Sequence, residues 1–148
     1  MLTFAEAAPH EWIAMNSADV DRFEKLSGQL LGLYEEMSLL SKKNPNDAVN
    51  KFKLKFINRQ LAESNALLAG KYRPYEDFEV FSEDDVPQNS DVVFILSQYL
   101  QCMEKLRADN VVYKAGNWHW YVKGEALDNV DEQGYTLIRS TEPKHLRD

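Results

Sequence analysis

The chain has 148 residues, a length typical of one domain, and 24 acidic against 17 basic residues give it a formal net charge of −7. Apolar residues make up 44% and charged residues 28% of the chain, values that indicate a folded globular protein rather than a disordered or fibrous one. No run of about 18 apolar residues occurs and Cys102 is the single cysteine, which excludes a membrane-spanning helix, an internal disulfide framework and a cysteine-based zinc site.

The first predicted element is a long helix over residues 17–43. Asn44 and Pro45 follow it and are typical of a helix end. Apolar residues recur along the helix at steps of three and four, the pattern of a heptad seam. These residues are Phe23, Leu26, Leu30, Leu33, Met37 and Leu40.

A second row on the same helix lies off this seam. It comprises Gly28, Leu31, Gly32, Glu35 and Leu39. Because glycine inside an exposed helix costs about 1 kcal/mol relative to alanine, two glycines four residues apart suggest that another backbone approaches closely. That backbone belongs either to the third predicted helix or to a second subunit; the alternative is a pair of tolerated glycines on an exposed face.

A second helix is predicted over residues 47–69, with Asn46 as its N-cap and Gly70 as its stop. The short connection favours an antiparallel helical hairpin. Two apolar stripes place the helix between two neighbours. One stripe comprises Val49, Phe52, Phe56 and Leu67, and the other Leu54, Ile57, Leu61 and Leu68. A basic row on the remaining face comprises Lys51, Lys55 and Arg59.

The rest of the chain predicts a segment held by aromatic residues, a third helix and a small sheet. Residues 71–89 carry four aromatic residues among acidic ones, with a short helical turn expected after Pro74. The third helix is predicted over residues 90–109 and a β region over residues 111–139, with strands over 111–113, 118–122 and 135–139. A frayed tail is expected over residues 140–148.

The predicted elements together give an α+β fold class. The chain is expected to be a mainly helical single domain over residues 1–148, with a three-helix bundle and a small antiparallel sheet.

The net charge is divided into blocks. Residues 1–41 carry −5, residues 42–73 carry +6, residues 74–91 carry −7 and residues 92–148 carry −1. The basic block either folds beside its acidic neighbours or forms a charged docking face.

We expect no catalytic constellation, no cofactor and no bound metal, because no complete motif for any of them is present. The first hypothesis for function is a non-catalytic protein-interaction module, an adaptor, regulator or inhibitor in the cytoplasm. Its expected surfaces are the glycine-containing row on the first helix, which also makes a homo-oligomer a candidate, and an acidic set. The acidic set comprises Glu76, Asp77, Glu83, Asp84 and Asp85.

Two alternatives remain open. Nucleic-acid binding would use Lys51, Lys55 and Arg59 as phosphate contacts, although the overall negative charge argues against it. A small-molecule or enzymatic site would lie near the aromatic strand, where alternation places Trp118 and Trp120 on one face and His119 on the other. The residues of that candidate pocket are Tyr113, Trp118, His119 and Trp120.

Overall fold

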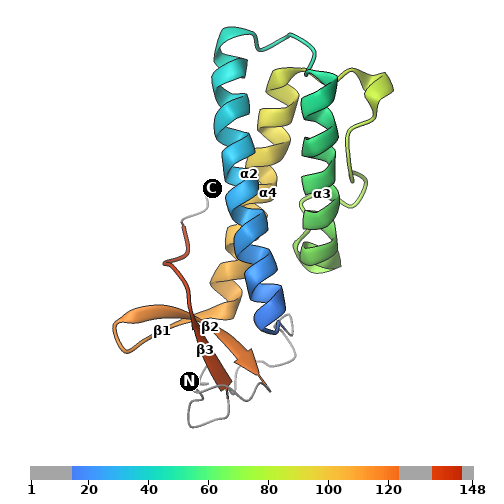
Figure 1. The fold of residues 1–148 in the computed structure, drawn as a ribbon. Helices are drawn as coiled ribbons and strands as arrows, with labels where there is room; N and C mark the ends of the chain where they lie inside the picture. The colour runs from blue at the N-terminus through green and yellow to red at the C-terminus, as the bar shows by residue number, and fades with distance from the viewer. Residues whose placement is uncertain (1–14, 124–134, 145–148) are drawn as a thin grey trace. The chain divides into compact units, whose positions relative to one another are not determined.

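A computed structural model of the protein describes residues 15–123 and 135–144. These residues form three α-helices, one short 3₁₀ helix and one three-stranded antiparallel sheet, which confirms the predicted α+β, mainly helical fold (Figure 1). The chain divides into two compact units, a helical unit of residues 23–103 and a second unit of residues 1–22 and 104–148. The single domain over residues 1–148 stays a prediction. Residues 124–134 of the predicted β region and residues 145–148 of the predicted tail lie outside the described residues.

Helix α2 spans Ser17–Lys43, the predicted range. At its start the Asn16 side chain accepts a hydrogen bond of 2.9 Å from the Asp19 amide, so Asn16 serves as the cap. The heptad seam forms the core side of the helix, where Phe23, Leu30 and Met37 are at most 1% exposed. The seam predicted from spacing is thus the buried stripe.

Helix α3 spans Lys51–Tyr72 and begins four residues later than predicted. Asn50, and not Asn46, is its cap, because the Asn50 side chain accepts a hydrogen bond from the Lys53 amide. The residues before it pair with a distant segment: the Val49 amide donates to the carbonyl of Pro87, and the Asn89 amide to that of Asp47, each at 2.9 Å. These long-range bonds take the backbone groups that a longer helix would have used.

The end of α3 also differs from the prediction. Helical structure passes Gly70 and reaches the buried Tyr72, although Ala69 departs from helical geometry with φ 52° and ψ −163°. Arg73 is extended because it precedes Pro74, whose ring disfavours a helical residue before it. The regular helix is thus interrupted at Ala69, next to the predicted stop at Gly70, and a further short helical turn reaches Tyr72 before Pro74 ends it.

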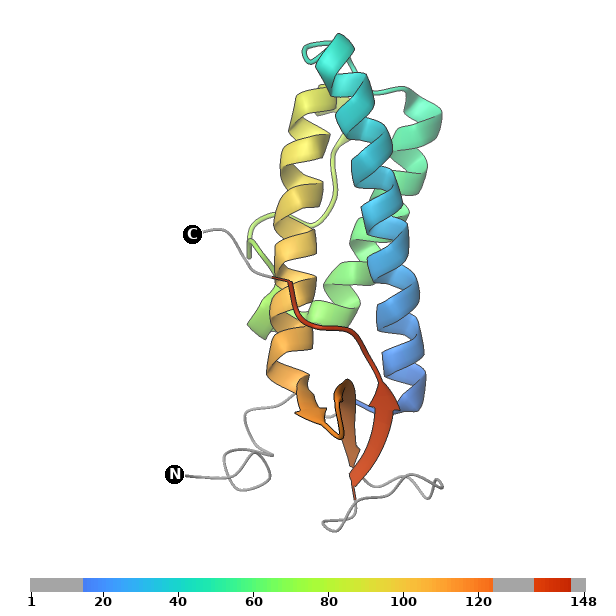
Figure 2. The same cartoon turned by 90° about the vertical axis from the view of Figure 1, so that its left-hand side faces the viewer.

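Helix α4 spans Asn89–Asn110, within one residue of the predicted range at each end. In the helical unit α4 lies behind α2 and α3 in the view of Figure 1, and Figure 2 shows it beside α2. Its fully buried side chains include Val92, Leu96, Tyr99 and Met103. The three helices thus enclose one apolar core, as the breadth of the apolar face on α4 predicts.

The acidic segment between α3 and α4 carries no helix directly after Pro74; a 3₁₀ helix lies later, at Glu83–Asp85. The aromatic residues hold the segment as predicted, because the Phe78 ring lies edge-on to the rings of Phe81 and Tyr99 with centroids 5.2 Å and 6.5 Å away. Asn58 adds two hydrogen bonds of 2.9 Å, from its Nδ2 to the Phe81 carbonyl and from the Phe81 amide to its Oδ1.

The sheet has the strand order β1-β2-β3, from Val111–Lys114, Asn117–Lys123 and Tyr135–Arg139. Its register pairs Val111 with Trp120 and Tyr113 with Trp118, so these four side chains share one face. Trp120 is 1% exposed and belongs to the core of the second unit, whereas Tyr113, near the hairpin tip, is 60% exposed.

The hairpin turn consists of Ala115 and Gly116, with φ values of 54° and 81°. Positive φ at both central residues is the geometry of a type I′ turn, which asparagine followed by glycine adopts most easily. Ala115→Asn should therefore raise the free energy of unfolding by about 0.5–1 kcal/mol, because alanine pays a steric cost in this conformation. Urea denaturation measures the change. Lys114→Asn, one residue earlier, is the control and should give no gain, whereas an Ala115→Asn variant less stable than wild type would show that the turn differs in solution.

The tail is not frayed over residues 140–144, contrary to the prediction. The Ser140 amide donates to the Trp118 carbonyl at 2.9 Å, and Ser140 Oγ accepts a hydrogen bond of 2.8 Å from Arg107. Further along, the Lys144 amide donates to Glu104 Oε1 at 3.0 Å. Arg107 and Glu104, which form a buried ion pair on α4, thus bind this segment. No local sequence pattern indicates these contacts.

Candidate docking surface on the helical unit

Helix α3 presents two aromatic side chains to solvent. Phe52 is 71% exposed and Phe56 is 37% exposed, although both belong to a stripe predicted to be buried. The other stripe packs inward as predicted, with Leu54, Ile57 and Leu61 at most 3% exposed. Val49 and Leu67 of the same stripe are buried, at 7% and 9% exposure, so the prediction of a core face is wrong only at Phe52 and Phe56, where no described element covers α3. Large exposed apolar side chains in one place are typical of interaction sites.

A groove of about 340 Å³ runs beside these rings, between α2 and α3. Its lining residues are Leu33, Glu36, Met37, Phe52, Lys53, Phe56 and Ile57. The Phe52 and Phe56 rings meet edge-to-face with centroids 5.0 Å apart, a geometry that aromatic pairs prefer. Across the groove, Lys53 Nζ lies 2.9 Å from Glu36 Oε1. We call this feature the α2–α3 groove.

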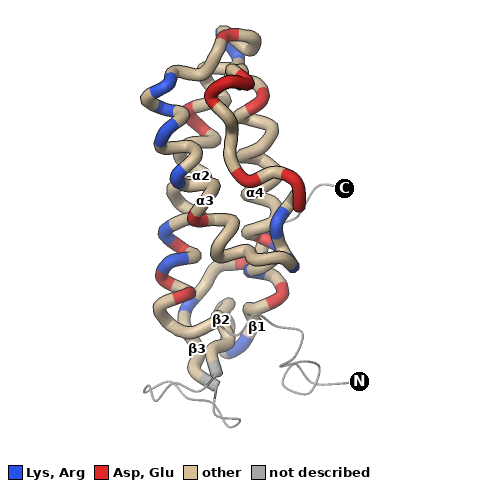
Figure 3. Tube along the Cα trace, turned by 90° about the vertical axis from the view of Figure 1, so that its right-hand side faces the viewer, with Lys and Arg blue, Asp and Glu red and all other residues tan. Residues whose placement is uncertain are grey.

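The predicted basic row lies on α3 at the same end as the exposed rings. Lys51, Lys55 and Arg59 are all exposed, and none of them forms an ion pair with an acidic residue that the structure describes. The Arg59 guanidinium instead lies 5.1 Å from the centroid of the Phe56 ring, within cation–π range. Figure 3 shows basic residues along one side of α3 and acidic residues along the segment after it. The acidic segment therefore does not cover the basic row.

The predicted acidic set is exposed along the segment between α3 and α4. Asn65 holds its middle part, because Nδ2 of Asn65 donates to the Glu79 carbonyl at 2.9 Å while its Oδ1 accepts a bond of 2.6 Å from the Tyr99 hydroxyl. Arg73 donates to the Phe78 carbonyl at 2.9 Å and lies 4.0 Å from the Glu79 carboxylate. The segment is thus fixed by its backbone while most of its carboxylates face solvent.

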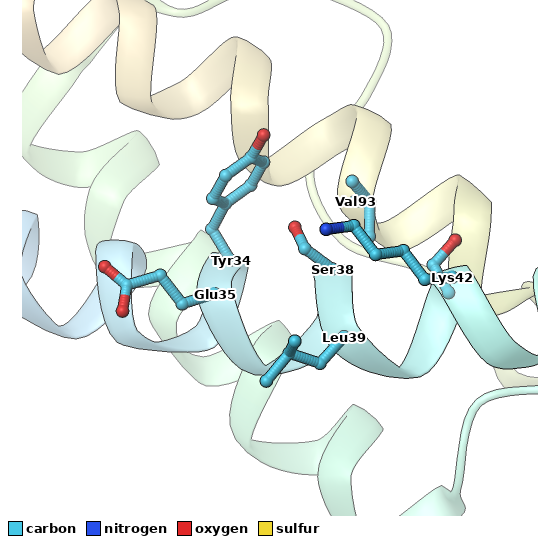
Figure 4. A pocket seen from close by; sticks show the side chains of 7 residues that line it. Tyr34, Glu35, Ser38, Leu39, Lys42 and Val93 are labelled. Atoms are coloured by element: carbon cyan, nitrogen blue, oxygen red, sulfur yellow. The ribbon is translucent and has the colours of Figure 1, made fainter.

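The glycine-containing row of α2 borders a second groove, of about 700 Å³, between α2 and α4. Glu35 and Leu39 line it, and Figure 4 shows Val93 of α4 beside Ser38 and Lys42. A Cβ added at Gly28 or Gly32 would meet nothing within 4 Å. The interpretation that α4 approaches these glycines is therefore wrong, because open space lies there. The row stays an exposed face, and its use by a second subunit stays a hypothesis.

The four residues of the predicted aromatic pocket do not converge. Tyr113 and Trp118 meet edge-to-face with centroids 5.4 Å apart, and Trp120 shares their face but is buried in the core. His119 lies on the opposite face of the sheet, where the register pairs it with Val112 and Arg139. Neither of the two grooves above includes any of these residues.

Two titratable groups of α4 have shifted pKa values. Burial raises the pKa of the Tyr99 hydroxyl, although the hydrogen bond to Asn65 lowers it in part. Burial also raises the pKa of the Cys102 thiol, which makes it a poor nucleophile at neutral pH. Over residues 15–123 and 135–144, no group of three His, Cys, Asp or Glu side chains is placed to hold a metal ion.

No protein-family model matches this sequence, and neither a curated protein nor a solved structure matches it. Within the described part of the chain, no helix is long and apolar enough to cross a lipid bilayer.

Sequence reasoning found the basic row but missed the rings beside it. Phe52 and Phe56 fit an apolar stripe, and a stripe is normally assigned to the core. The available signal was the alternation of Lys51, Phe52, Lys55, Phe56 and Arg59, which mixes charge and aromatic residues on one flank.

Proposed function

We propose that this protein is a non-catalytic interaction module that binds a partner protein through the α2–α3 groove and the exposed flank of α3. The observation that carries the proposal is the pair Phe52 and Phe56, exposed beside an apolar groove and next to cations that have no acidic partner among residues 15–123 and 135–144. Aromatic and arginine side chains of this kind contribute most of the binding energy in many protein interfaces. A cytoplasmic location belongs to the proposal and is supported by a single unpaired cysteine, Cys102.

Nucleic-acid binding through the same basic row is the second candidate. Exposed aromatic rings beside lysine and arginine also suit stacking on single-stranded bases. The net charge of −7 and the aliphatic floor of the groove, formed by Leu33, Met37 and Ile57, favour a protein partner instead.

The test is quantitative affinity capture with the wild-type protein and the variant Phe52→Ala/Phe56→Ala, in nuclease-treated native lysate. We expect a defined set of proteins to be depleted about tenfold by the double substitution, the effect of losing one or two principal contacts. Phe94→Ala is the matched control, since Phe94 is a 54% exposed phenylalanine of α4, and it should leave the set unchanged.

Capture of the same proteins in equal amounts by the wild type, by Phe52→Ala/Phe56→Ala and by Phe94→Ala would contradict the proposal. Material that is captured from untreated lysate and lost from nuclease-treated lysate would instead favour the nucleic-acid candidate. Because both substituted rings are exposed, the urea midpoint should stay at the wild-type value, and this measurement separates lost binding from lost folding.

A further inference from the structure

We infer that the α2–α3 groove accepts an amphipathic helix of the partner, with acidic side chains along the flank that faces Lys51, Lys55 and Arg59. This inference rests on the proposed function and adds the chemistry of the occupant. It follows from the shape of the groove, the apolar floor and the placement of charge along its two rims.

The shape favours a helix. The groove lies between two antiparallel helices, joined across it by the contact between Glu36 and Lys53. In the helical unit α4 packs on the side of α2 and α3 that faces away from the viewer in Figure 1, and no other described helix of this unit lies on the near side. A helix laid along two antiparallel helices is the arrangement that completes a four-helix bundle, and it presents apolar residues at steps of three and four.

The floor of the groove suits aliphatic anchors from such a helix. Met37 and Ile57 are almost completely buried beneath it, and the exposed Phe52 and Phe56 form one wall. Methionine adapts to differently shaped side chains, and edge-to-face rings offer a broad apolar wall. Leucine or isoleucine side chains of the occupant would cover apolar surface that the described part of the chain leaves exposed.

The charges determine which flank of the occupant is acidic. Lys51, Lys55 and Arg59 are four residues apart and therefore extend about 12 Å along one side of α3. Carboxylates at steps of four on the occupant would have the same spacing. On the α2 rim, Glu36 is already paired with Lys53, so it does not repel them. Because residues 74–91 carry −7, an acidic occupant is repelled from the segment after α3 and attracted to the basic row.

The probes for the test are three synthetic amphipathic helical peptides with the same leucine positions and with glutamate, lysine or glutamine along one flank. A fourth peptide has the glutamate composition in scrambled order. Fluorescence anisotropy measures their binding to the full chain at low and high salt. We expect the glutamate peptide to bind most tightly, to weaken as salt rises and to lose affinity when scrambled.

Charge reversal gives the sharper comparison. Lys51→Glu/Lys55→Glu should weaken binding of the glutamate peptide about fivefold or more and strengthen binding of the lysine peptide, the effect expected of two exposed ion pairs. Lys42→Glu/Lys43→Glu is the matched control, with the same change in net charge on two exposed residues of α2, and it should leave the preference unchanged.

Equal binding of the three ordered peptides, or equal effects of the two charge reversals, would overturn the inference. If no peptide binds while Phe52→Ala/Phe56→Ala still depletes captured proteins, the proposed function stands and the acidic-helix inference fails. If the double substitution also depletes nothing, both fail. Tight binding of a single-stranded oligonucleotide in place of the glutamate peptide would also overturn the inference.

Discussion

Arg107→Ala is expected to lower the free energy of unfolding by about 3–5 kcal/mol, the typical cost of removing one partner from a buried ion pair. Arg107 and Glu104 are 5% and 9% exposed, and the Arg107 Nε lies 3.0 Å from Glu104 Oε2. The guanidinium also donates to Ser140 and lies 5.5 Å from the Trp120 ring centroid. Removing it leaves the Glu104 carboxylate buried without its cation and detaches Ser140. Urea denaturation followed by tryptophan fluorescence measures the loss.

Lys105→Ala is the control for that prediction. Lys105 and Asp109 form an ion pair of 3.0 Å on the same helix, but Lys105 is exposed, so its removal should cost roughly 0.5 kcal/mol or less. The double substitution Glu104→Leu/Arg107→Met should recover most of the stability lost in Arg107→Ala, because it leaves no unpaired charge. Equal losses in Arg107→Ala and Lys105→Ala would show that the pair is solvated in solution.

Asn65→Ala is expected to lower the free energy of unfolding by about 1–3 kcal/mol, since it leaves the buried Tyr99 hydroxyl without its acceptor. The Tyr99 hydroxyl loses the acceptor that lies 2.6 Å away, and the Glu79 carbonyl loses its donor. Tyr99 is fully buried, so no solvent replaces the lost acceptor without a rearrangement of the core. Urea denaturation measures the free energy of unfolding. Asn46→Ala is the control, at an exposed asparagine between α2 and α3, and it should change this free energy little.

A double-mutant cycle tests the mechanism of this loss. Adding Tyr99→Phe to Asn65→Ala should cost less than the sum of the two single effects, because the unsatisfied hydroxyl is removed. Burial raises the pKa of Tyr99 above its ordinary value of 10.0, so the unfolded chain ionises first. The resulting stability is present below pH 10 and is lost as the pH rises further, and this alkaline loss should be smaller in Tyr99→Phe. Additive single effects would show that the two side chains do not interact.

Much of the fold follows from local pattern. The heptad seam from Phe23 to Leu40 predicts α2 and its buried stripe, and the β-formers of residues 111–113 and 118–122 predict the two strands of the hairpin. Helix α3 begins later than its local pattern predicts, because the backbones of Val49 and Asp47 bond to residues 87–89, about 40 positions away in the chain. Such long-range bonds leave no trace in the spacing of apolar residues near residue 47.

The candidate site was only half predictable. The spacing of Lys51, Lys55 and Arg59 predicted a basic row, and the structure leaves that row without acidic partners among the described residues. Phe52 and Phe56 were assigned to the core because periodicity shows that residues share a face, and does not show whether another element covers that face.

By itself the sequence determined the helix periods, the three-stranded β region and the division of the −7 charge into basic and acidic blocks, since each depends on residues that are close in the chain. The tertiary structure alone decided that Phe52 and Phe56 are exposed while the rest of their stripe is buried, where residues 140–144 are bound and which side of α3 the acidic segment occupies. The physical reason is that the uncovered flank of α3 and the buried partners of Arg107 depend on side chains from distant segments.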